Sequence, residues 1–595
     1  MTFLETFTGA WGFLPVAVPA CIFVAIRIGA LVFPESAAHR AVGGPLLTLA
    51  LIVATVGLAG VVHLVSFGVF ALLLAIAAVG LGLLRRDRRL DIPLRTVLSR
   101  DTVPLLVVAG AALGIAILVA RWLPIWQWDS LGYHLPYVNF VLVGRGLDAV
   151  PTHIPYLSSY PHNVDRFMVA LRAMLPDDRL VDLAQVPLAI PGAAATAGIA
   201  RLAGAERAHA VAAGAAWILV PATFLELPTN YIDVGCAAFF LSAIYFVLAP
   251  PTRATLMTAG IALGLYLGSK ANAPVAASIL GLVLLVRGVR AKLGAAALLA
   301  LAAALAFGAD TYITNWIHYG NPVWPVNVVL GPLHLPGTLS ANDLLGGGPL
   351  VIRAHGILPW RLLSSWAALA APPVHDMRLG GYGPIFLVAL PFAVLILVRA
   401  RSVALGVALA ATLASPAPEV ARYVLAFPAM VLALAAPHLA RLAPRPRSLV
   451  FAGAAALGIA QIVYAWPGLF AGGPPLRAYA SMSDDERRMA IGVGGPVAPY
   501  LEAQRRVGPG ETYAFAIGDD LLYYLAWDGQ LTYPVVAIGE QASGERIDEV
   551  LAREHVRVVM TRDDSAVGRW AQAHPERFER LFSFRTGPGS VYERR

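Results

Sequence analysis

The sequence predicts a polytopic α-helical membrane domain followed by a small α/β domain, and three observations support this fold class. Hydrophobic residues make up 58% of the 595 residues and charged residues only 13%, whereas soluble domains contain about 45–50% and about 25% respectively. Apolar runs long enough to cross a bilayer recur along the chain. After about residue 470 these runs stop. We therefore expect a membrane domain over residues 1–470 and a separate α/β domain over residues 471–595.

Fourteen apolar segments are expected to form spanning helices, because each approaches the roughly 20 residues that a helix needs to cross the hydrocarbon core. The first is expected to be a retained span, since no small-residue cleavage site follows it. The expected helices are residues 12–33, 45–62, 67–84, 103–121, 182–200, 209–225, 232–249, 255–271, 273–287, 293–309, 383–398, 403–416, 420–439 and 448–467.

One orientation of these helices places the basic loops on a single side, which the positive-inside rule identifies as the cytoplasm. Two long loops, residues 122–181 and 310–382, then lie on the outer side together with the C-terminal domain. We therefore expect a multi-pass protein of the bacterial inner membrane with a periplasmic C-terminal domain. The basic loops contain Arg40, the run Arg85–Arg100, Arg201, Arg207, Arg253, Arg287, Arg290, Lys292, Arg399, Arg401, Arg441, Arg445 and Arg447.

The excess of positive charge does not indicate a nucleic-acid partner. The formal net charge is +8 and the pI is about 9.5, but the basic residues are spread over short loops between apolar runs, as a membrane topology requires. The two cysteines, Cys21 and Cys236, both lie in apolar runs. Neither a disulfide framework nor a thiolate metal site is expected from them.

The C-terminal region has alternating helical and extended patterns. An amphipathic helix is expected over Ser483–Arg506, and Ser483 and Glu486 occupy the positions of a capping box at its start. The other expected elements are strands at Tyr513–Ile517, Arg557–Thr561 and Ser590–Glu593, and helices at Asp519–Trp527, Gly544–His555 and Ala566–Phe582.

The first long loop contains a carboxylate among aromatic residues. Asp129 follows the fourth expected helix and has Trp128, Tyr133 and His134 close to it in the sequence. Aromatic side chains at a membrane interface can serve as anchors alone. A carboxylate placed among them is a candidate general base, and we expect Asp129 to have that function.

Three further charged residues are expected at the outer membrane face. Asp233 opens a helix, where an acid can simply stabilise the N-terminus, but membrane-edge acids are also candidates for functional sites. Lys270 and Arg422 are exceptions to the positive-inside pattern. A snorkelling anchor would explain Lys270, and an ion pair with Glu419 would explain Arg422. Both side chains are also suited to hold a lipid phosphate.

Seven of the thirteen histidines lie in the two long loops, but none forms a pair with HxxxH-type spacing. The number of loop histidines leaves a divalent metal as an open alternative, but their spacing does not favour one. No cofactor is expected to be required. A nucleotide-binding G-x-G-x-x-G in a strand–turn–helix setting does not occur. The loop histidines are His134, His153, His162, His318, His334, His355 and His375.

Five segments, in this order, resemble the GT-C superfamily of membrane glycosyltransferases, specifically the bacterial branch related to protein O-mannosyltransferases and lipid A aminoarabinose transferases. The five segments together span about half of the chain. They are WDSLGYHLP around Asp129, NYIDVGCAAFF around Asp233, GLYLGSK ending at Lys270, YGNPVWP at Tyr319–Pro325 and RYVLAFP at Arg422–Pro428.

The resemblance implies roles for these residues. Asp129 would deprotonate the acceptor, Asp233 would orient the site, and Lys270 and Arg422 would hold the donor phosphate. The residues expected to contact sugar or acceptor are Trp128, Tyr133, His134, Tyr231 and Tyr423.

Two features depart from the family pattern. Three helices precede the one that leads into the Asp129 loop, and the paired acids of that loop are reduced to Asp129 unless Asp148 or Asp165 contributes.

The function that this resemblance implies is transfer of a hexosyl or pentosyl group from a polyprenyl-phosphate donor to a lipid, glycan or protein acceptor by inverting displacement. A transporter or flippase of lipid-linked sugars is an alternative, but its charges would lie within the spans, whereas here they gather at one face. A second alternative is an O-antigen-ligase or polymerase type of enzyme, and a third is a non-catalytic scaffold.

Overall fold

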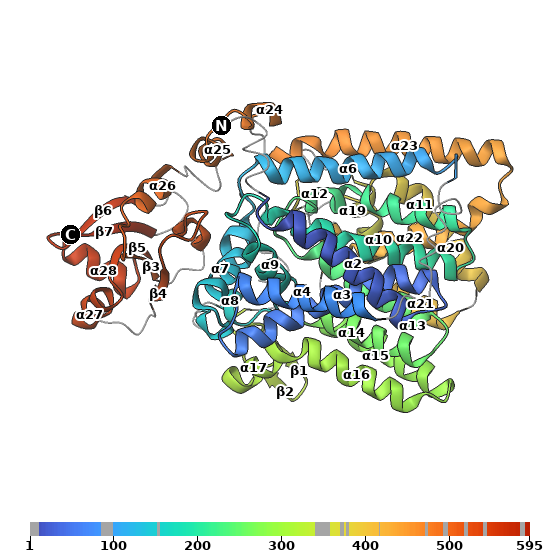
Figure 1. Ribbon diagram of the computed structural model, residues 1–595, viewed down its shortest axis with the longest axis horizontal. Coiled ribbons are helices and arrows are strands. Elements are labelled where there is room, and N and C mark those ends of the chain that lie inside the picture. The colour runs from blue at the N-terminus through green and yellow to red at the C-terminus, as the bar shows by residue number, and fades with distance from the viewer. Residues whose placement is uncertain are drawn as a thin grey trace.

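The computed structural model describes residues 11–84, 99–150, 155–339, 358–368, 374–376, 380–400, 402–415, 417–470, 474–491, 498–516, 522–538, 544–583 and 589–595. Figure 1 shows a body of helices that lie side by side along the long axis, with the C-terminal strands beyond one end.

Each of the fourteen segments expected to be helical contains helix, although several boundaries differ. Serine or threonine caps begin some of them. The side chains of Ser36, Ser66 and Thr252 each accept a hydrogen bond from the backbone N–H three residues later, which satisfies a donor that the helix start leaves free. The helices of this body are α2 (Leu14–Val32), α3 (Ala37–Val61), α4 (Phe67–Leu83), α6 (Val103–Trp122), α10 (Gln185–Leu202), α11 (Arg207–Ile218), α12 (Pro221–Glu226), α13 (Asp233–Leu248), α14 (Arg253–Leu267), α15 (Ala273–Arg290), α16 (Gly294–Gly308), α20 (Gly383–Ala400), α21 (Val403–Ala411), α22 (Ala426–Ala435) and α23 (Pro444–Ala465).

The structure does not confirm fourteen membrane crossings. Among the described residues, seven helices are long and apolar enough to cross a membrane, or eight if α16 and α17 (Asp310–Tyr319), which meet at an angle of 63°, form one span. Others are shorter. The nine residues of α21 extend only about 14 Å, less than half of the roughly 30 Å core. Apolar composition alone could not reveal where each helix ends.

Small residues bring α14 and α16 into close contact. Gly260 and Gly264 of α14 face Ala300 and Ala304 of α16, and a Cβ added to Gly264 would lie 2.6 Å from the Ala304 carbonyl oxygen. Side-chain-free positions four residues apart allow two helix backbones to approach closely, as in many membrane helix pairs. The glycine spacing in the sequence of α14 therefore determines this packing.

The two long loops are partly helical. The first contains η1 (Ser130–His134), α7 (Leu135–Gly144), η2 (Leu147–Ala149), α8 (Pro155–Ser158), α9 (Asn163–Ala173) and η3 (Val181–Ala184). The second contains α17, an antiparallel pair of short strands, β1 (Val328–Leu330) and β2 (Leu333–Leu335), and α19 (Leu358–Ala367). Of these segments, α7, α8 and α17 lie at the same end of the helical body as the C-terminal strands (Figure 1).

The C-terminal region forms a mixed five-stranded sheet in the order β4-β3-β5-β7-β6. Strand β3 pairs in parallel with β4 and β5, whereas β7 pairs antiparallel with β5 and β6. The elements of this region are α24 (Leu476–Tyr479), α25 (Asp484–Ile491), α26 (Ala498–Arg505), β3 (Thr512–Ala516), η7 (Tyr523–Ala526), β4 (Val535–Ile538), α27 (Glu545–Arg553), β5 (Val556–Arg562), α28 (Ala566–Ala573), β6 (Phe578–Ser583) and β7 (Gly589–Arg594).

Several expectations for this region are corrected by the structure. The helix expected over Ala566–Phe582 ends at Ala573, and its last part belongs to β6, because pairing with β7 outweighs the local helical pattern. Strand β4 was not expected. The start of the helix expected at Asp519–Trp527 lies outside the described residues, and its end is a short 3-10 turn. The capping box is confirmed, since the Ser483 backbone N–H donates to Glu486 over 2.7 Å.

The C-terminal region packs against the first long loop. The ring of Phe140 on α7 lies 4.9 Å from that of Trp527 and 5.7 Å from that of Phe515. Asp178 accepts hydrogen bonds from Arg488, over 3.0 Å, and from the Tyr524 hydroxyl. Aromatic packing and a buried ion pair therefore fix η7 next to the loop that contains Asp129.

Candidate functional site

A cavity of about 860 Å³ lies where the loops meet the helix ends. It is bounded by η1, α8, α9, the start of α13, the turn between α14 and α15, and η4 (Ala421–Val424). Tyr523 of the C-terminal region also reaches it. The titratable side chains that line it are Asp129, Tyr133, His134, Tyr156, Tyr160, His162, Asp165, Asp233, Lys270, Arg422, Tyr423 and Tyr523.

A π-helical turn positions two of these side chains. Asp129 is the N-cap of η1 and His134 is its last residue, and the turn closes with a hydrogen bond from the Leu135 N–H to the Ser130 carbonyl. Such turns are rare and often occur at functional sites. Both residues at the ends of this turn line the cavity.

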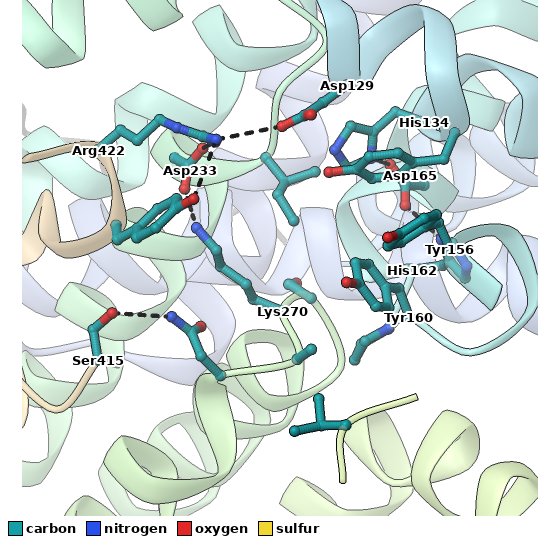
Figure 2. Close-up of a pocket in the computed structure, with 18 of the residues that line it drawn as sticks. Asp129, His134, Tyr156, Tyr160, His162, Asp165, Asp233, Lys270, Ser415 and Arg422 are labelled. Carbon is teal, nitrogen blue, oxygen red and sulfur yellow. Dashed lines mark hydrogen bonds and ion pairs between the residues drawn. The ribbon is translucent and has the colours of Figure 1, made fainter. Parts of the chain in front are cut away.

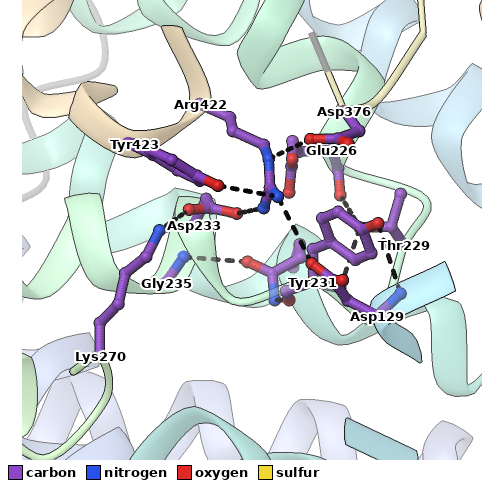
Figure 3. A network of polar contacts seen from close by, with 11 residues as sticks. Asp129, Glu226, Thr229, Tyr231, Asp233, Gly235, Lys270, Asp376, Arg422 and Tyr423 are labelled. Carbon is purple, nitrogen blue, oxygen red and sulfur yellow. Dashed lines mark hydrogen bonds and ion pairs between the residues drawn. The ribbon is translucent and has the colours of Figure 1, made fainter. Parts of the chain in front are cut away.

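Arg422 is the centre of the charged cluster shown in Figure 3. Its Nη1 donates to Asp233 Oδ2 over 3.0 Å, its Nε to Asp376 Oδ1 over 2.6 Å, and its Nη2 to Asp129 Oδ2 over 3.4 Å. Lys270 donates to the other oxygen of Asp233. The alternative explanation of Arg422 as a partner of Glu419 alone is therefore wrong, because three other carboxylates surround its guanidinium.

Two members of the cluster, Asp233 and Arg422, are buried. The side chains of Asp233 and Arg422 are 1% and 7% exposed, and charges buried to this extent are tolerated only when they are paired. Lys270 lies outside the helices. Burial lowers the pKa of its ammonium group, but the negative charge of Asp233 has the larger effect and holds that pKa above its ordinary value. Lys270 therefore stays charged, and a snorkelling role does not describe a side chain turned into a cavity.

Aromatic rings cover the two cations. The Lys270 ammonium lies 4.6 Å from the centre of the Tyr423 ring, and the Arg422 guanidinium lies 4.7 Å from the same ring and 4.9 Å from that of Tyr231. Cation–π contacts of this kind stabilise positive charge in a partly dry site. Tyr231 also connects to Asp129, whose backbone N–H donates to the Tyr231 hydroxyl over 3.4 Å.

Three carboxyl groups of the site were not chosen from the sequence. Asp376 contacts Arg422 from the second long loop. Glu226, at the end of α12, is fully buried, and neither of its oxygens has a hydrogen-bond partner among the described residues. An ionised carboxylate without a partner is costly to bury. Asp165, named from the sequence only as an additional acid, bridges two histidines.

Eight of the nine residues expected to form the site line the cavity. They are Trp128, Asp129, Tyr133, His134, Asp233, Lys270, Arg422 and Tyr423. The ninth, Tyr231, lies against the Arg422 guanidinium. Four segments separated widely in the sequence therefore meet in one place.

Two of the loop histidines, His134 and His162, share Asp165 as a partner, and His375 lies apart from them. His375 stacks edge-on against Trp126 and Tyr231, and burial lowers its pKa to about 4. His153 and His355 lie outside the described residues. Among the residues that the structure describes, no group of three or more histidine, cysteine and acidic side chains is arranged to hold a metal ion.

Comparisons with known proteins give similarity in structure alone. No family model matches the sequence, and no curated protein matches it. The fold is similar to that of ArnT from Cupriavidus metallidurans bound to undecaprenyl phosphate, with a TM-score of 0.49 and 13% identity over 82% of this chain and 98% of ArnT.

A second solved structure is the archaeal oligosaccharyltransferase AglB from Archaeoglobus fulgidus, in complex with an inhibitory peptide and a dolichol-phosphate. Its TM-score is 0.38, with 15% identity over 81% of this chain and 72% of AglB. Similarity at this level assigns no activity to this chain, and the function has to be argued from its own residues.

Proposed function

We propose that this protein is a glycosyltransferase that moves a sugar from a polyprenyl-phosphate donor to an acceptor hydroxyl. The observation that carries the proposal is the convergence of Lys270 and Arg422 on Asp233, in a cavity that also contains Asp129. The two cations come from turns about 150 residues apart in the sequence. Only the fold brings them together.

The ligand suggested by this cavity has an anionic head and an apolar tail. Arginine offers a planar fork to phosphate and lysine a point charge. Next to Lys270, the lining includes the apolar residues Pro274, Val275 and Ala414 and the hydrogen-bonded pair Asn272 and Ser415. Val275 is 61% exposed. A prenyl chain could therefore leave the cavity towards lipid while its phosphate stays at the cations.

The proposed chemistry is a single inverting displacement. The acceptor hydroxyl transfers its proton to Asp129, and its oxygen forms a bond to the anomeric carbon of the sugar. The bond between that carbon and the phosphate oxygen breaks, and polyprenyl phosphate leaves with the electron pair. Lys270 and Arg422 stabilise the charge that develops on the leaving oxygen.

The carboxylates that hold the cations before the donor binds also have a function in this proposal. Asp233 contacts both Lys270 and Arg422, so it fixes their positions without a ligand. Preorganised charges stabilise a transition state better than groups that must first rearrange. The donor phosphate has to replace some of these contacts when it binds.

We place the site on the periplasmic side of a bacterial inner membrane, because the basic loops at the other helix ends favour the cytoplasm. The acceptor is then a lipid, a glycan or a protein in that compartment, and no nucleic acid takes part. The displacement requires no cofactor. A divalent ion between the carboxylates and the phosphate remains a separate hypothesis, and chelation during turnover would test it.

The direct test uses purified protein in liposomes with polyprenyl-phosphate monosaccharides and hydroxyl acceptors. We expect release of polyprenyl phosphate that depends on Lys270 and Arg422. Movement of the intact donor across the bilayer without release would instead identify a flippase. Activity only with diphosphate-linked oligosaccharides would identify a ligase or polymerase.

A further inference from the structure

A second buried polar cluster lines the cavity apart from the Arg422 cluster. Asp165 accepts from His134 Nδ1 over 2.8 Å on one oxygen and from His162 Nδ1 over 2.6 Å on the other. The side chains of Asp165, His134 and His162 are 2%, 4% and 7% exposed. In Figure 2, this cluster lies on one side of the cavity and Arg422 on the other.

The contacts of His162 define its charge. Its Nε2 lies 2.9 Å from the Leu157 carbonyl oxygen, which can only accept, so Nε2 carries a proton. Its Nδ1 faces a carboxylate oxygen and carries a proton as well. The ring also stacks on Tyr137, with centroids 3.7 Å apart and planes at 11°, an arrangement that favours a cation. These contacts fit an imidazolium paired with the Asp165 carboxylate.

The state of Asp165 agrees with this assignment. The two ring N–H groups that face its oxygens stabilise the ionised form of its carboxyl over the neutral form. An ionised Asp165 accepts from both rings. Because His162 already neutralises it, the adjacent His134 has no need of a second positive charge.

In its neutral form, the His134 ring has one tautomer that fits the Asp165 carboxylate. Its Nδ1 carries the proton that Asp165 accepts, so its Nε2 has a lone pair. No hydrogen bond from the described part of the chain reaches that nitrogen, and His134 lines the cavity. A ligand group that meets Nε2 must donate a hydrogen bond, which a sugar hydroxyl does.

Three tyrosine rings line the same cavity as His134. The ring centres of Tyr133, Tyr156 and Tyr160 are 5.3 to 5.9 Å apart. Burial raises the pKa of Tyr133 and of Tyr160, so their hydroxyl groups stay protonated. Aromatic walls with a few oriented polar groups are typical of small-molecule sites.

We propose that His134 and the three tyrosines form a sugar subsite in which a ligand hydroxyl donates to His134 Nε2. Asp165 and His162 are positioning residues, because they act on the ligand only through the tautomer of His134. The proposal rests on the proposed sugar transfer. The hydroxyl belongs either to the transferred sugar or to a glycan acceptor.

The first test needs no turnover. In the full-length protein labelled with ¹⁵N-histidine, His162 should show two protonated nitrogens at neutral pH, and His134 a protonated Nδ1 with a bare Nε2. His134→Gln and His162→Gln assign the signals by their loss. A neutral His162, or a protonated Nε2 on His134, would overturn the assignment of the subsite.

The second test measures binding. His134→Leu should weaken binding of polyprenyl-phosphate monosaccharides about 3- to 10-fold, the value of one hydrogen bond, and leave binding of bare polyprenyl phosphate unchanged. His134→Gln, which can present an acceptor oxygen, should restore part of the loss. His318→Gln, at an exposed position on α17, is the control.

The source of the hydroxyl follows from which ligand is affected. A loss confined to sugar-bearing donors places the transferred sugar in the subsite, and a loss confined to glycan acceptors places the acceptor there. Equal binding of all ligands by wild type and His134→Leu would disprove the subsite. If wild-type protein binds these lipids but never releases polyprenyl phosphate, the proposed function fails while the subsite is still decided.

Discussion

Arg422 and Asp233 are 189 residues apart in the sequence, and the Arg422 Nη1 donates to Asp233 Oδ2 over 3.0 Å where both side chains are buried. The same aspartate accepts from Lys270 through its other oxygen. One carboxylate therefore aligns two cations from separate turns. The account of this protein as a lipid-phosphate enzyme depends on that alignment.

Replacing Arg422 should affect donor binding more than any other change. Arg422→Gln leaves Asp233 and Asp376 without their guanidinium partner, and loss of one member of a buried charge pair costs about 2–5 kcal/mol. We expect polyprenyl-phosphate affinity to fall by about 30-fold or more, measured by equilibrium binding in detergent. Arg253→Gln, at an exposed position opposite the site, should bind normally. Equal affinities in the two variants would contradict the phosphate role.

Asp129→Asn tests the proton transfer. We expect turnover to fall by about 10²- to 10⁴-fold, the usual contribution of a general base. Polyprenyl-phosphate binding should be nearly unchanged, because the contact between Asp129 and Arg422 is long, at 3.4 Å. Asp148→Asn serves as a matched control, since Asp148 belongs to the same loop and pairs with the exposed His63. Retained turnover in the Asp129 variant would exclude that residue as the base.

The close contact of α14 and α16 predicts an effect on stability. In Gly264→Ala the new Cβ would lie 2.6 Å from the Ala304 carbonyl oxygen and 2.7 Å from Phe307 Cβ. Overpacking of this kind costs about 1–3 kcal/mol. Gly114→Ala, where no atom lies within 4 Å of the new Cβ, should be neutral or slightly stabilising. Thermal unfolding in detergent compares the two, and similar melting temperatures would show that the helices are not tightly packed.

Asp178 predicts a pH dependence in the contact between the C-terminal region and the first loop. Burial raises the pKa of Asp178, but Arg488 and the Tyr524 hydroxyl outweigh it, and the pKa is lowered. A group whose pKa is lower in the folded state stabilises the fold above its unfolded value, about 3.9, and loses this effect as pH falls through the folded value.

We therefore expect proteolytic release of residues 471–595 to increase below about pH 4 in the wild type. Asp178→Asn should release them more readily at pH 7, by about 1–3 kcal/mol, and should show a smaller change with acid. An identical acid response in both proteins would mean that other carboxylates control the contact.

The sequence predicted the site better than the boundaries of its elements. Asp129, Asp233, Lys270 and Arg422 could be found because charge at the ends of apolar helices is rare and needs a reason. Asp376 could not, since nothing in a Gly- and Pro-rich loop shows that its carboxylate reaches Arg422. Strand β6 was missed because its pairing with β7 is a long-range effect that local propensity does not contain.

Buried groups that lack a local pattern were also missed. Glu226 ends an apolar run and has the sequence context of any loop acid, and only its burial marks it. Asp165 could have been found from its spacing, because His162 precedes it by three residues at the start of α9. The link from Asp165 to His134 crosses the loop and required the fold.

The measurement that tests the central claim most directly is a structure of this protein with polyprenyl phosphate bound. The account predicts that the phosphate lies within hydrogen-bond distance of Lys270 Nζ and the Arg422 guanidinium, with contacts of Asp233 partly replaced and the chain leaving past Val275. A phosphate bound at the basic loops around Arg253 and Arg447, or outside the cavity, would contradict it.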